Sequence, residues 1–293
     1  MTHVIGRFAP SPTGPLHFGS VVTAVGSFLE TRSRSGQWLV RIDDLDPPRE
    51  EAGASSIILK TLEALGLEWD REVLFQSTRI PAYRAALEHL SLAAHTYACT
   101  CSRRQTKTGP YPGTCRDAVF RSKTAHSIRV RVGNQTLTMK DAIQGSFTQS
   151  LAETSGDFIV RRTDGLYAYH LATVVDDAWQ NVNDIVRGAD LLDATPRQLY
   201  LQTLLGFEQP RYAHLPVVLD NNGAKLSKQS KATPILPNEA PLALFQALQF
   251  LGLKIPKEAR HETPENQLTW ALPRWDLSRI DPTSKRDCQL NVC

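Results

Sequence analysis

The chain has 293 residues, of which 41% are hydrophobic, and its formal net charge is +3 at pH 7. This length suffices for one large domain or two moderate ones, and the composition is that of an ordinary globular protein. No apolar run reaches the ~20 residues of a membrane span, and the chain enters a strand without a signal peptide, so we expect a cytoplasmic location and no membrane partner. The small net charge permits nucleic-acid binding through a local patch but does not by itself indicate it.

The first motif combines a short strand near residues 5–8, a Pro/Gly-rich turn, and a helix whose apolar spacing begins at Phe18. A helix that follows a strand directly points its free N–H groups and positive dipole end above the sheet, where phosphate commonly binds. Gly14 and Gly19 allow the backbone to approach a ligand closely, and Thr13 and His17 offer side-chain donors.

A second strand is predicted over residues 38–42 after a crossover helix, which makes the two strands parallel. It runs into an acidic segment that begins with Asp43. Because ligands bind at the carboxyl ends of parallel strands, this segment is either part of a ligand crevice or a solvated acidic loop.

Three thiols, Cys99, Cys101 and Cys115, lie close together beside Gly and Pro turns in a segment with few apolar residues. This spacing suits a structural tetrahedral zinc site with a fourth ligand from Tyr111, His95 or His126. Pattern alone favours a histidine, since phenolate is a rare zinc ligand. The alternative is three reduced cysteines without a metal.

The remaining pattern predicts alternating helices and strands. We expect helices over residues 50–65 and 79–94, strands of an inserted subdomain over 127–148, and a hairpin around 163–165. Thr195 is the expected N-cap of a further helix that ends at Gly206, and residues 239–277 read as helical.

Six collinear runs between residues 4 and 230 together resemble the class I aminoacyl-tRNA synthetases of the glutamyl type. His17 and Gly19 match the first His and the Gly of the HIGH signature, with Ser20 in place of the last His. Asp43 stands where the family's acidic run has Glu, and residues 225–229 resemble the KMSKS loop. Further matches are the runs 169–177 and 184–192, and the Gln-Ser pair at 76–77.

The resemblance implies an α/β fold in which a Rossmann-like parallel sheet is split by a zinc-bearing insertion and followed by a small helical domain. The implied parts are 1–98 and 169–224 for the two halves of the catalytic domain, 99–168 for the insertion, and 225–293 for the KMSKS-like loop and helical domain. The zinc ligands implied are Cys99, Cys101, Tyr111 and Cys115.

The resemblance also implies roles at the reaction centre, where ATP with Mg²⁺ activates L-glutamate. The residues implied in catalysis are Thr13, His17, Lys225 and Lys228, and those that hold ATP are Gly14, His17, Gly19, Ser227 and Lys228. The residues implied in glutamate binding are Arg7, Phe8, Ala9, Pro10, Ser11, Asp43, Tyr169 and Arg187.

The chain stops soon after the KMSKS-like loop, where full-length members continue into anticodon-reading domains. It therefore resembles a shortened branch of the family that glutamylates the queuosine base of tRNA(Asp), and we expect a monomer. Phosphate contacts are expected, as an alternative to a plain solvated basic face, from Arg103, Arg104, Lys107, Arg116, Arg121 and Lys123. Two other readings remain: an aminoacylating enzyme that lacks an anticodon domain, and a non-catalytic tRNA-binding module.

Overall fold

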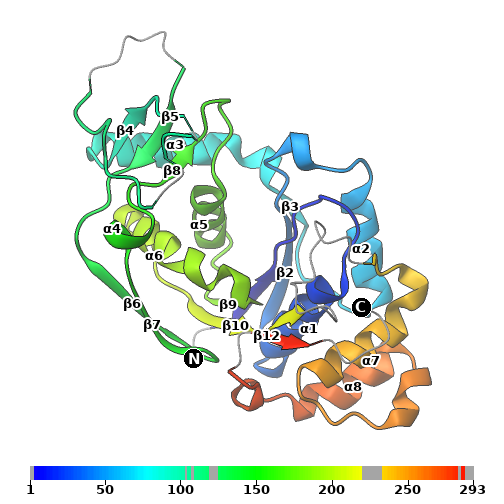
Figure 1. The fold of residues 1–293 in the computed structure, drawn as a ribbon. Helices are drawn as coiled ribbons and strands as arrows, with labels where there is room; N and C mark the ends of the chain where they lie inside the picture. The colour runs from blue at the N-terminus through cyan, green and yellow to red at the C-terminus, as the bar shows by residue number, and fades with distance from the viewer. Residues whose placement is uncertain are drawn as a thin grey trace.

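A computed structural model describes residues 3–102, 104–106, 109–118, 125–219 and 233–282, and the backbone of 285–287. Its centre is a seven-stranded sheet in the order β3-β2-β1-β9-β10-β6-β7 (Figure 1). The pairs from β3 to β6 are parallel, and β7 runs antiparallel to β6. These strands are β1 Ile5–Phe8, β2 Gln37–Ile42, β3 Leu74–Phe75, β6 Thr136–Asp141, β7 Gly145–Ser150, β9 Asp184–Gly188 and β10 Arg211–Leu215.

The strand order reverses between β1 and β9, because β2 and β3 lie on one side of β1 and the later strands on the other. In an open parallel sheet such a switch point leaves a crevice beyond the carboxyl ends of the strands. The helices that alternate with the strands of the main sheet are α1 Phe18–Ser33, α2 Ala54–Ala64, α5 Tyr169–Trp179 and α6 Thr195–Leu205. The fold class predicted from the sequence is confirmed.

A separate three-stranded sheet carries the thiol segment. It has the order β4-β5-β8 and lies away from the main sheet in Figure 1. Its strands and the neighbouring helices are β4 Thr96–Cys99, β5 Ser127–Val130, β8 Ile159–Arg161, α3 Ile80–Leu92 and α4 Leu151–Thr154. Strands β6 and β7, which we had assigned to the insertion, instead extend the main sheet beside β10. The predicted hairpin at 163–165 reduces to one isolated bridge between Arg161 and Tyr167.

The C-terminal helices α7 Ala240–Phe250 and α8 Pro264–Ala271 lie beside α1 at the lower right of Figure 1, where α7 packs against α1 and α2. Their apolar residues belong to the same buried cluster as those of α1 and β2, so this region shares one core with the first half of the sheet. A short two-stranded sheet pairs β11 Val217–Leu219 with β12 Lys285–Asp287. Within the described ranges the 3₁₀ helices are Pro47–Arg49, Gln76–Arg79, Ala189–Ala194, Pro237–Glu239, Lys257–His261, Leu272–Arg274 and Leu277–Arg279.

Two local predictions were wrong. Helix α2 begins at Ala54 rather than at residue 50. Gly53 adopts a left-handed conformation (φ +82°), so the helix cannot extend back through it. Thr195 is not an N-cap: a 3₁₀ helix leads directly into α6, so Thr195 is already helical, while Gly206 ends α6 as predicted. Among the described residues, no helix is long and apolar enough to cross a membrane.

Candidate active site and metal centre

The first helix begins at the carboxyl end of β1, as the sequence predicts. His17 is its N-cap residue, and its Nδ1 accepts a hydrogen bond from the backbone N–H of Ser20 at 3.3 Å. The Ser20 hydroxyl lies 3.1 Å from the other ring nitrogen. Ser20, which stands in place of the last His of the HIGH signature, therefore contacts His17, the first His of that signature. At Gly19 a Cβ atom would meet the His17 ring at 3.2 Å, so a larger residue there would require the imidazole to shift.

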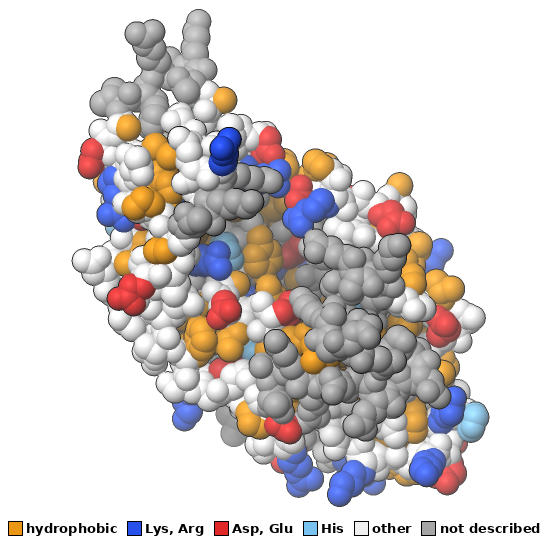
Figure 2. Space-filling view, viewed as in Figure 1, with side chains coloured by type: hydrophobic (Ala, Val, Ile, Leu, Met, Phe, Trp, Pro, Cys, Tyr) orange, Lys and Arg blue, Asp and Glu red, His pale blue; other side chains and the backbone are white. Residues whose placement is uncertain are grey.

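A cavity of about 560 Å³ opens at this switch point. This face of the molecule is hollowed near its middle (Figure 2). Most of the residues predicted for glutamate and ATP line the cavity, namely Arg7, Phe8, Ala9, Pro10, Ser11, Thr13, His17, Gly19, Tyr169 and Arg187. Asp43 and Gly14 are not among its lining residues. Lys225, Ser227 and Lys228 lie outside the described residues.

Arg187, in β9, lines this cavity, and one of its nitrogens has no hydrogen-bond partner among the described residues. Its Nε donates to His214 Nε2 at 3.1 Å, and its Nη2 donates to Thr195 Oγ1 at 2.7 Å. Its Nη1 is buried and has no hydrogen-bond partner within the described part of the chain. Since an unpaired buried donor is costly, an anionic ligand at this nitrogen would satisfy it.

Four charged side chains form a buried cluster below the cavity, which we call the ion cluster: Arg7, Arg41, Asp43 and Asp177. Arg7 Nε and Nη2 donate to the two carboxylate oxygens of Asp177 at 3.2 and 3.3 Å. Arg41 Nη1 also donates to Asp177, at 2.6 Å, and its Nε donates to Asp43 at 2.8 Å. The Nε–Nη2 edge of Arg7 is thus occupied, and a ligand carboxylate must use its Nη1–Nη2 edge.

The two acids of the ion cluster have pKa values shifted in opposite directions, although both are buried. Burial raises the pKa of Asp43 to about 6, although Arg41 opposes the shift. At Asp177 burial also acts upward, but the two arginines outweigh it and hold the pKa below its ordinary value. Asp177 is therefore the fixed anion that orients Arg7 and Arg41, while Asp43 lies against Arg41 rather than in the cavity wall.

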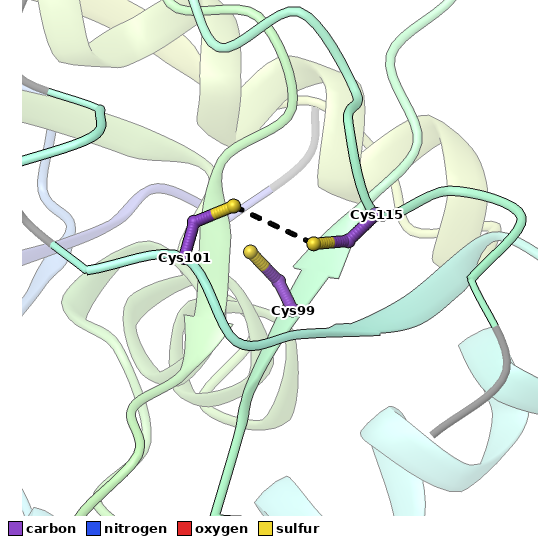
Figure 3. Close-up of side chains that lie close together, drawn as sticks. All are labelled: Cys99, Cys101 and Cys115. Carbon is purple, nitrogen blue, oxygen red and sulfur yellow. Dashed lines mark hydrogen bonds between the residues drawn. The ribbon is translucent and has the colours of Figure 1, made fainter.

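The second polar site, which we call the thiol cluster, consists of Cys99, Cys101, Cys115 and Tyr111. Figure 3 shows the three sulfur atoms turned toward one another, and they lie within 4.8 Å of each other. The Sγ atoms of Cys101 and Cys115 are 3.5 Å apart. Tetrahedral zinc with 2.3 Å Zn–S bonds places its sulfur ligands about 3.8 Å apart, so the spacing fits.

The Tyr111 hydroxyl lies beside the three sulfur atoms, where a fourth donor would be needed. It lies 3.3 Å from Cys99 Sγ and 3.4 Å from Cys101 Sγ. Among the described residues neither His95 nor His126 joins the group of potential metal ligands. Burial acts to raise the pKa of the Cys115 thiol, but hydrogen bonds from Tyr111 and neighbouring groups lower it to about 7, toward the thiolate that binds metals.

One buried cation faces the thiol cluster. Arg129 in β5 is 6% exposed, donates from Nε to Cys99 Sγ at 3.2 Å, and places its guanidinium carbon 3.9 Å from the centre of the Tyr111 ring. Three thiolates and a phenolate around a divalent ion would carry a net charge of −2. The arginine offsets part of that charge, so the donor set and its surroundings fit a metal ion.

Sequence reasoning missed the side chains that hold the predicted ones in place. Asp177, His214, Thr195 and Asp141 contact predicted residues or support those contacts from distant parts of the chain. The one available signal was charge inside apolar strands, since an Arg or His in a buried strand needs a partner.

Comparison with known proteins agrees with this geometry. Residues 3–266 match the family model described as tRNA synthetases class I (E and Q), catalytic domain. A Pseudomonas aeruginosa protein named Glutamyl-Q tRNA(Asp) synthetase is 51% identical over 278 residues, which cover 94% of each chain. A protein of the same name from Ectopseudomonas mendocina is 50% identical over 281 residues and 95% of each chain.

Solved structures show the same fold. A glutamate tRNA ligase from Elizabethkingia meningosepticum superimposes with a TM-score of 0.82 at 23% identity, covering 98% of this chain and 67% of that one. The glutamate-tRNA synthetase of Elizabethkingia anophelis gives a TM-score of 0.80, covering 97% and 68%. The shared fold extends over nearly the whole chain and about two thirds of each synthetase.

Proposed function

Since the chain belongs to the class I tRNA synthetases of the E and Q type, we propose that this ligase activates L-glutamate with ATP and transfers it to the queuosine base of tRNA(Asp). The observation that carries the proposal is the cavity lined by Arg7, Arg187 and the start of α1, in which Arg187 keeps one guanidinium nitrogen without a hydrogen-bond partner among the described residues. Such a site offers cationic donors for the carboxylates of glutamate and a helix N-terminus for phosphate. The acceptor follows the name shared by relatives that are half identical over 94–95% of the chain.

The proposed reaction has two steps. A carboxylate oxygen of glutamate attacks the α-phosphorus of ATP, and the bond to pyrophosphate breaks. A queuosine hydroxyl then attacks the activated carbonyl carbon, releases AMP, and loses its proton. The protein needs no covalent intermediate, because positioning and charge stabilisation suffice.

We assign roles in this reaction to the residues predicted from the sequence. Thr13, His17 and the N-terminus of α1 face the phosphates with Mg²⁺, helped by Lys225, Ser227 and Lys228. Arg7, Tyr169 and Arg187 bind glutamate. Asp43 acts through Arg41, because its carboxylate is 2.8 Å from that guanidinium and is not in the cavity wall.

We also propose that the thiol cluster holds one structural zinc ion and that the protein works as a cytoplasmic monomer. The sulfur spacing and the buried Arg129 support the ion. The parts 1–98, 99–168, 169–224 and 225–293 remain a useful division of roles. Their boundaries do not coincide with separate cores, because β6 and β7 join the main sheet.

The experiment that tests the function uses labelled glutamate, ATP, and tRNA(Asp) with or without queuosine. We expect label only on the queuosine-containing tRNA, and pyrophosphate exchange that depends on glutamate and proceeds without tRNA. Oxidising the 3′-terminal diol while the queuosine diol is protected should leave glutamylation intact. Loss of labelling after that oxidation would instead support aminoacylation, and absence of exchange would support the non-catalytic reading.

Within this assay Arg187→Gln should raise the apparent KM for glutamate about ten- to a hundredfold, because a charge-assisted contact is lost. The apparent KM for ATP should change less than twofold. Arg7→Ala should act in the same direction. Unchanged glutamate dependence in both variants would remove these arginines from the site.

A further inference from the structure

Two buried side chains, first His214 and then Asp141, connect Arg187 to β6, the strand next to the edge of the main sheet. His214 Nε2 accepts from Arg187 Nε at 3.1 Å, and His214 Nδ1 lies 2.6 Å from Asp141 Oδ2. His214 and Asp141 have fully buried side chains. Asp141 ends β6, the strand that the sequence had placed in the inserted subdomain, and its backbone faces β10 through the Tyr212 pair.

The hydrogen-bond directions fix the protonation of His214. A guanidinium Nε always donates, so the facing Nε2 carries a lone pair, and the single ring proton lies on Nδ1, pointing to Asp141. Burial and the charge of Arg187 lower the pKa of His214 although Asp141 opposes this, so the neutral form is kept. The other tautomer would place two N–H groups face to face at Arg187.

Asp141 is itself held firmly in one orientation. Its Oδ1 accepts backbone hydrogen bonds from Ile143, Gln144 and His214 at 2.8–3.1 Å, which leaves Oδ2 for the imidazole. Burial acts to raise the pKa of Asp141, but these bonds and His214 hold it below its ordinary value. The turn between β6 and β7 is tied to the same strand, because Gln144 Nε2 donates to the His214 carbonyl at 2.9 Å.

Thr195 completes the support for Arg187. Its hydroxyl accepts from Nη2 at 2.7 Å and donates to the Leu191 carbonyl at 3.0 Å. With Nε and Nη2 both engaged, the guanidinium plane is fixed and only Nη1 remains without a partner among the described residues.

We infer that Asp141 and His214 are positioning residues for the amino-acid substrate: by fixing the Nδ1-protonated tautomer of His214 they hold the Arg187 guanidinium in the cavity wall, where it can bind a substrate carboxylate. This inference rests on the proposed function of Arg187. It assigns to the β6–β7 hairpin a role in substrate selection at a site that the hairpin does not touch.

Asp141→Asn tests the inference with a nearly isosteric change. The amide oxygen can keep the three backbone hydrogen bonds, but its NH₂ group then faces the imidazole and favours the tautomer with the proton on Nε2. That proton opposes Arg187 Nε. In glutamate-dependent pyrophosphate exchange we expect the KM for glutamate to rise about ten- to a hundredfold, with the KM for ATP changed less than twofold. Equal changes in both, or none in either, would overturn the inference.

A matched pair at His214 provides a second test. The His214→Gln side chain reaches far enough to present an oxygen to Arg187 Nε, whereas the His214→Asn side chain is too short and retains only the contact toward Asp141. We expect the glutamate KM of the Gln variant to stay within about threefold of the wild-type value, and that of the Asn variant to rise at least tenfold. A purely structural role of His214 would be shown by a larger rise of the glutamate KM in the Gln variant than in the Asn variant. It would also be shown by equal rises of KM together with equal falls in melting temperature.

Arg187→Gln separates failure of the inference from failure of the proposed function. If that variant raises the glutamate KM and Asp141→Asn does not, the positioning role is wrong and the substrate site stands. If neither changes the glutamate KM, Arg187 does not bind the substrate and both assignments are wrong.

Discussion

The ion cluster and the thiol cluster are both buried and polar, but they depend on their surroundings in opposite ways. The ion cluster lies on the opposite face of the sheet from a large apolar core that joins α1, β2, α7 and α8, because Arg41 alternates in β2 with Val40 and Ile42 of that core. Around the thiol cluster the buried core consists of Tyr97, Tyr111 and the cysteines themselves. In the first case the fold confines charged side chains, whereas in the second the polar side chains must supply the cohesion of the segment.

This difference predicts separate ways to destabilise each region. The charges of the ion cluster are paired with one another inside the protein, and this pairing offsets part of their desolvation. With the proposed zinc ion in the thiol cluster, the stability of the thiol segment should depend on that ion. A change at one cluster should therefore leave the other largely intact.

The largest effect is expected from removal of the proposed zinc ion. Chelation, or Cys115→Ser, should unfold the segment around residues 99–118, because structural zinc contributes on the order of 10 kcal/mol in small sites. Hydrogen exchange should show lost protection in β4 and β5 and retained protection in β1 and β9. Thr100→Ser, at an exposed position between two of the cysteines, is the control. Full protection of β4 in metal-free protein would contradict the expectation that the thiol segment depends on a metal for its stability.

The converse change is Arg41→Met in the ion cluster. It leaves Asp43 and Asp177 buried with less compensation, and removal of one partner of a buried pair costs about 3–5 kcal/mol. Urea unfolding of the main sheet measures this cost, while the metal content should stay at the wild-type level. Arg49→Met removes an exposed pair with Asp46 and should cost less than about 1 kcal/mol. Similar costs for the two variants would show that the cluster is not a stabilising unit.

Local signals explain what the sequence predicted well. The turn before α1 carries prolines and glycines next to a helical apolar pattern, so strand, turn and helix were all recognisable. The thiols could be grouped because cysteine is rare and chemically distinct, and Cys99, Cys101 and Cys115 lie within 17 positions. The structure brings them together as predicted.

Long-range pairing explains what the sequence did not predict. Arg7 and Asp177 are 170 positions apart, and Asp141 and His214 are 73 apart. Alternation identifies β6 as a strand but does not say which sheet it joins, so its pairing with β10 was missed. Thr195 before a proline has the pattern of an N-cap, and only the preceding 3₁₀ helix excludes that role.

A smaller effect should show whether the thiol cluster also needs paired charge. Arg129→Gln removes the guanidinium beside Cys99 and Tyr111 and should weaken zinc binding about ten- to a hundredfold, as for other outer-shell contacts. Competition with a chromophoric chelator measures the affinity. Arg104→Gln removes the same charge from an exposed position and should leave the zinc affinity unchanged. Equal affinities in both variants would mean that the donors alone set the strength of the site.

The smallest effect concerns His170, which lies where the two regions meet. Its ring contacts Phe158, near the β8 strand, with centroids 6.0 Å apart, and Tyr169, which lines the cavity, at 5.4 Å. Its Nδ1 is buried and has no hydrogen-bond partner within the described residues. Burial, together with Arg197 and Arg187, lowers the pKa of His170 to about 3.

The sign of the resulting pH dependence follows from proton uptake on unfolding. Between about pH 3 and 6.5 the unfolded chain binds a proton at His170 that the folded protein does not, so this contribution to stability is complete above pH 6.5 and falls on acidification. From pH 6.5 to 5 the loss is about 1–2 kcal/mol. His170→Phe should remove this part of the slope in urea unfolding, whereas His89→Gln, which removes an exposed imidazole, supplies the reference slope. If the two variants lose stability equally over this range, the imidazole of His170 is not held neutral at the boundary, and the two regions are not joined by a buried histidine.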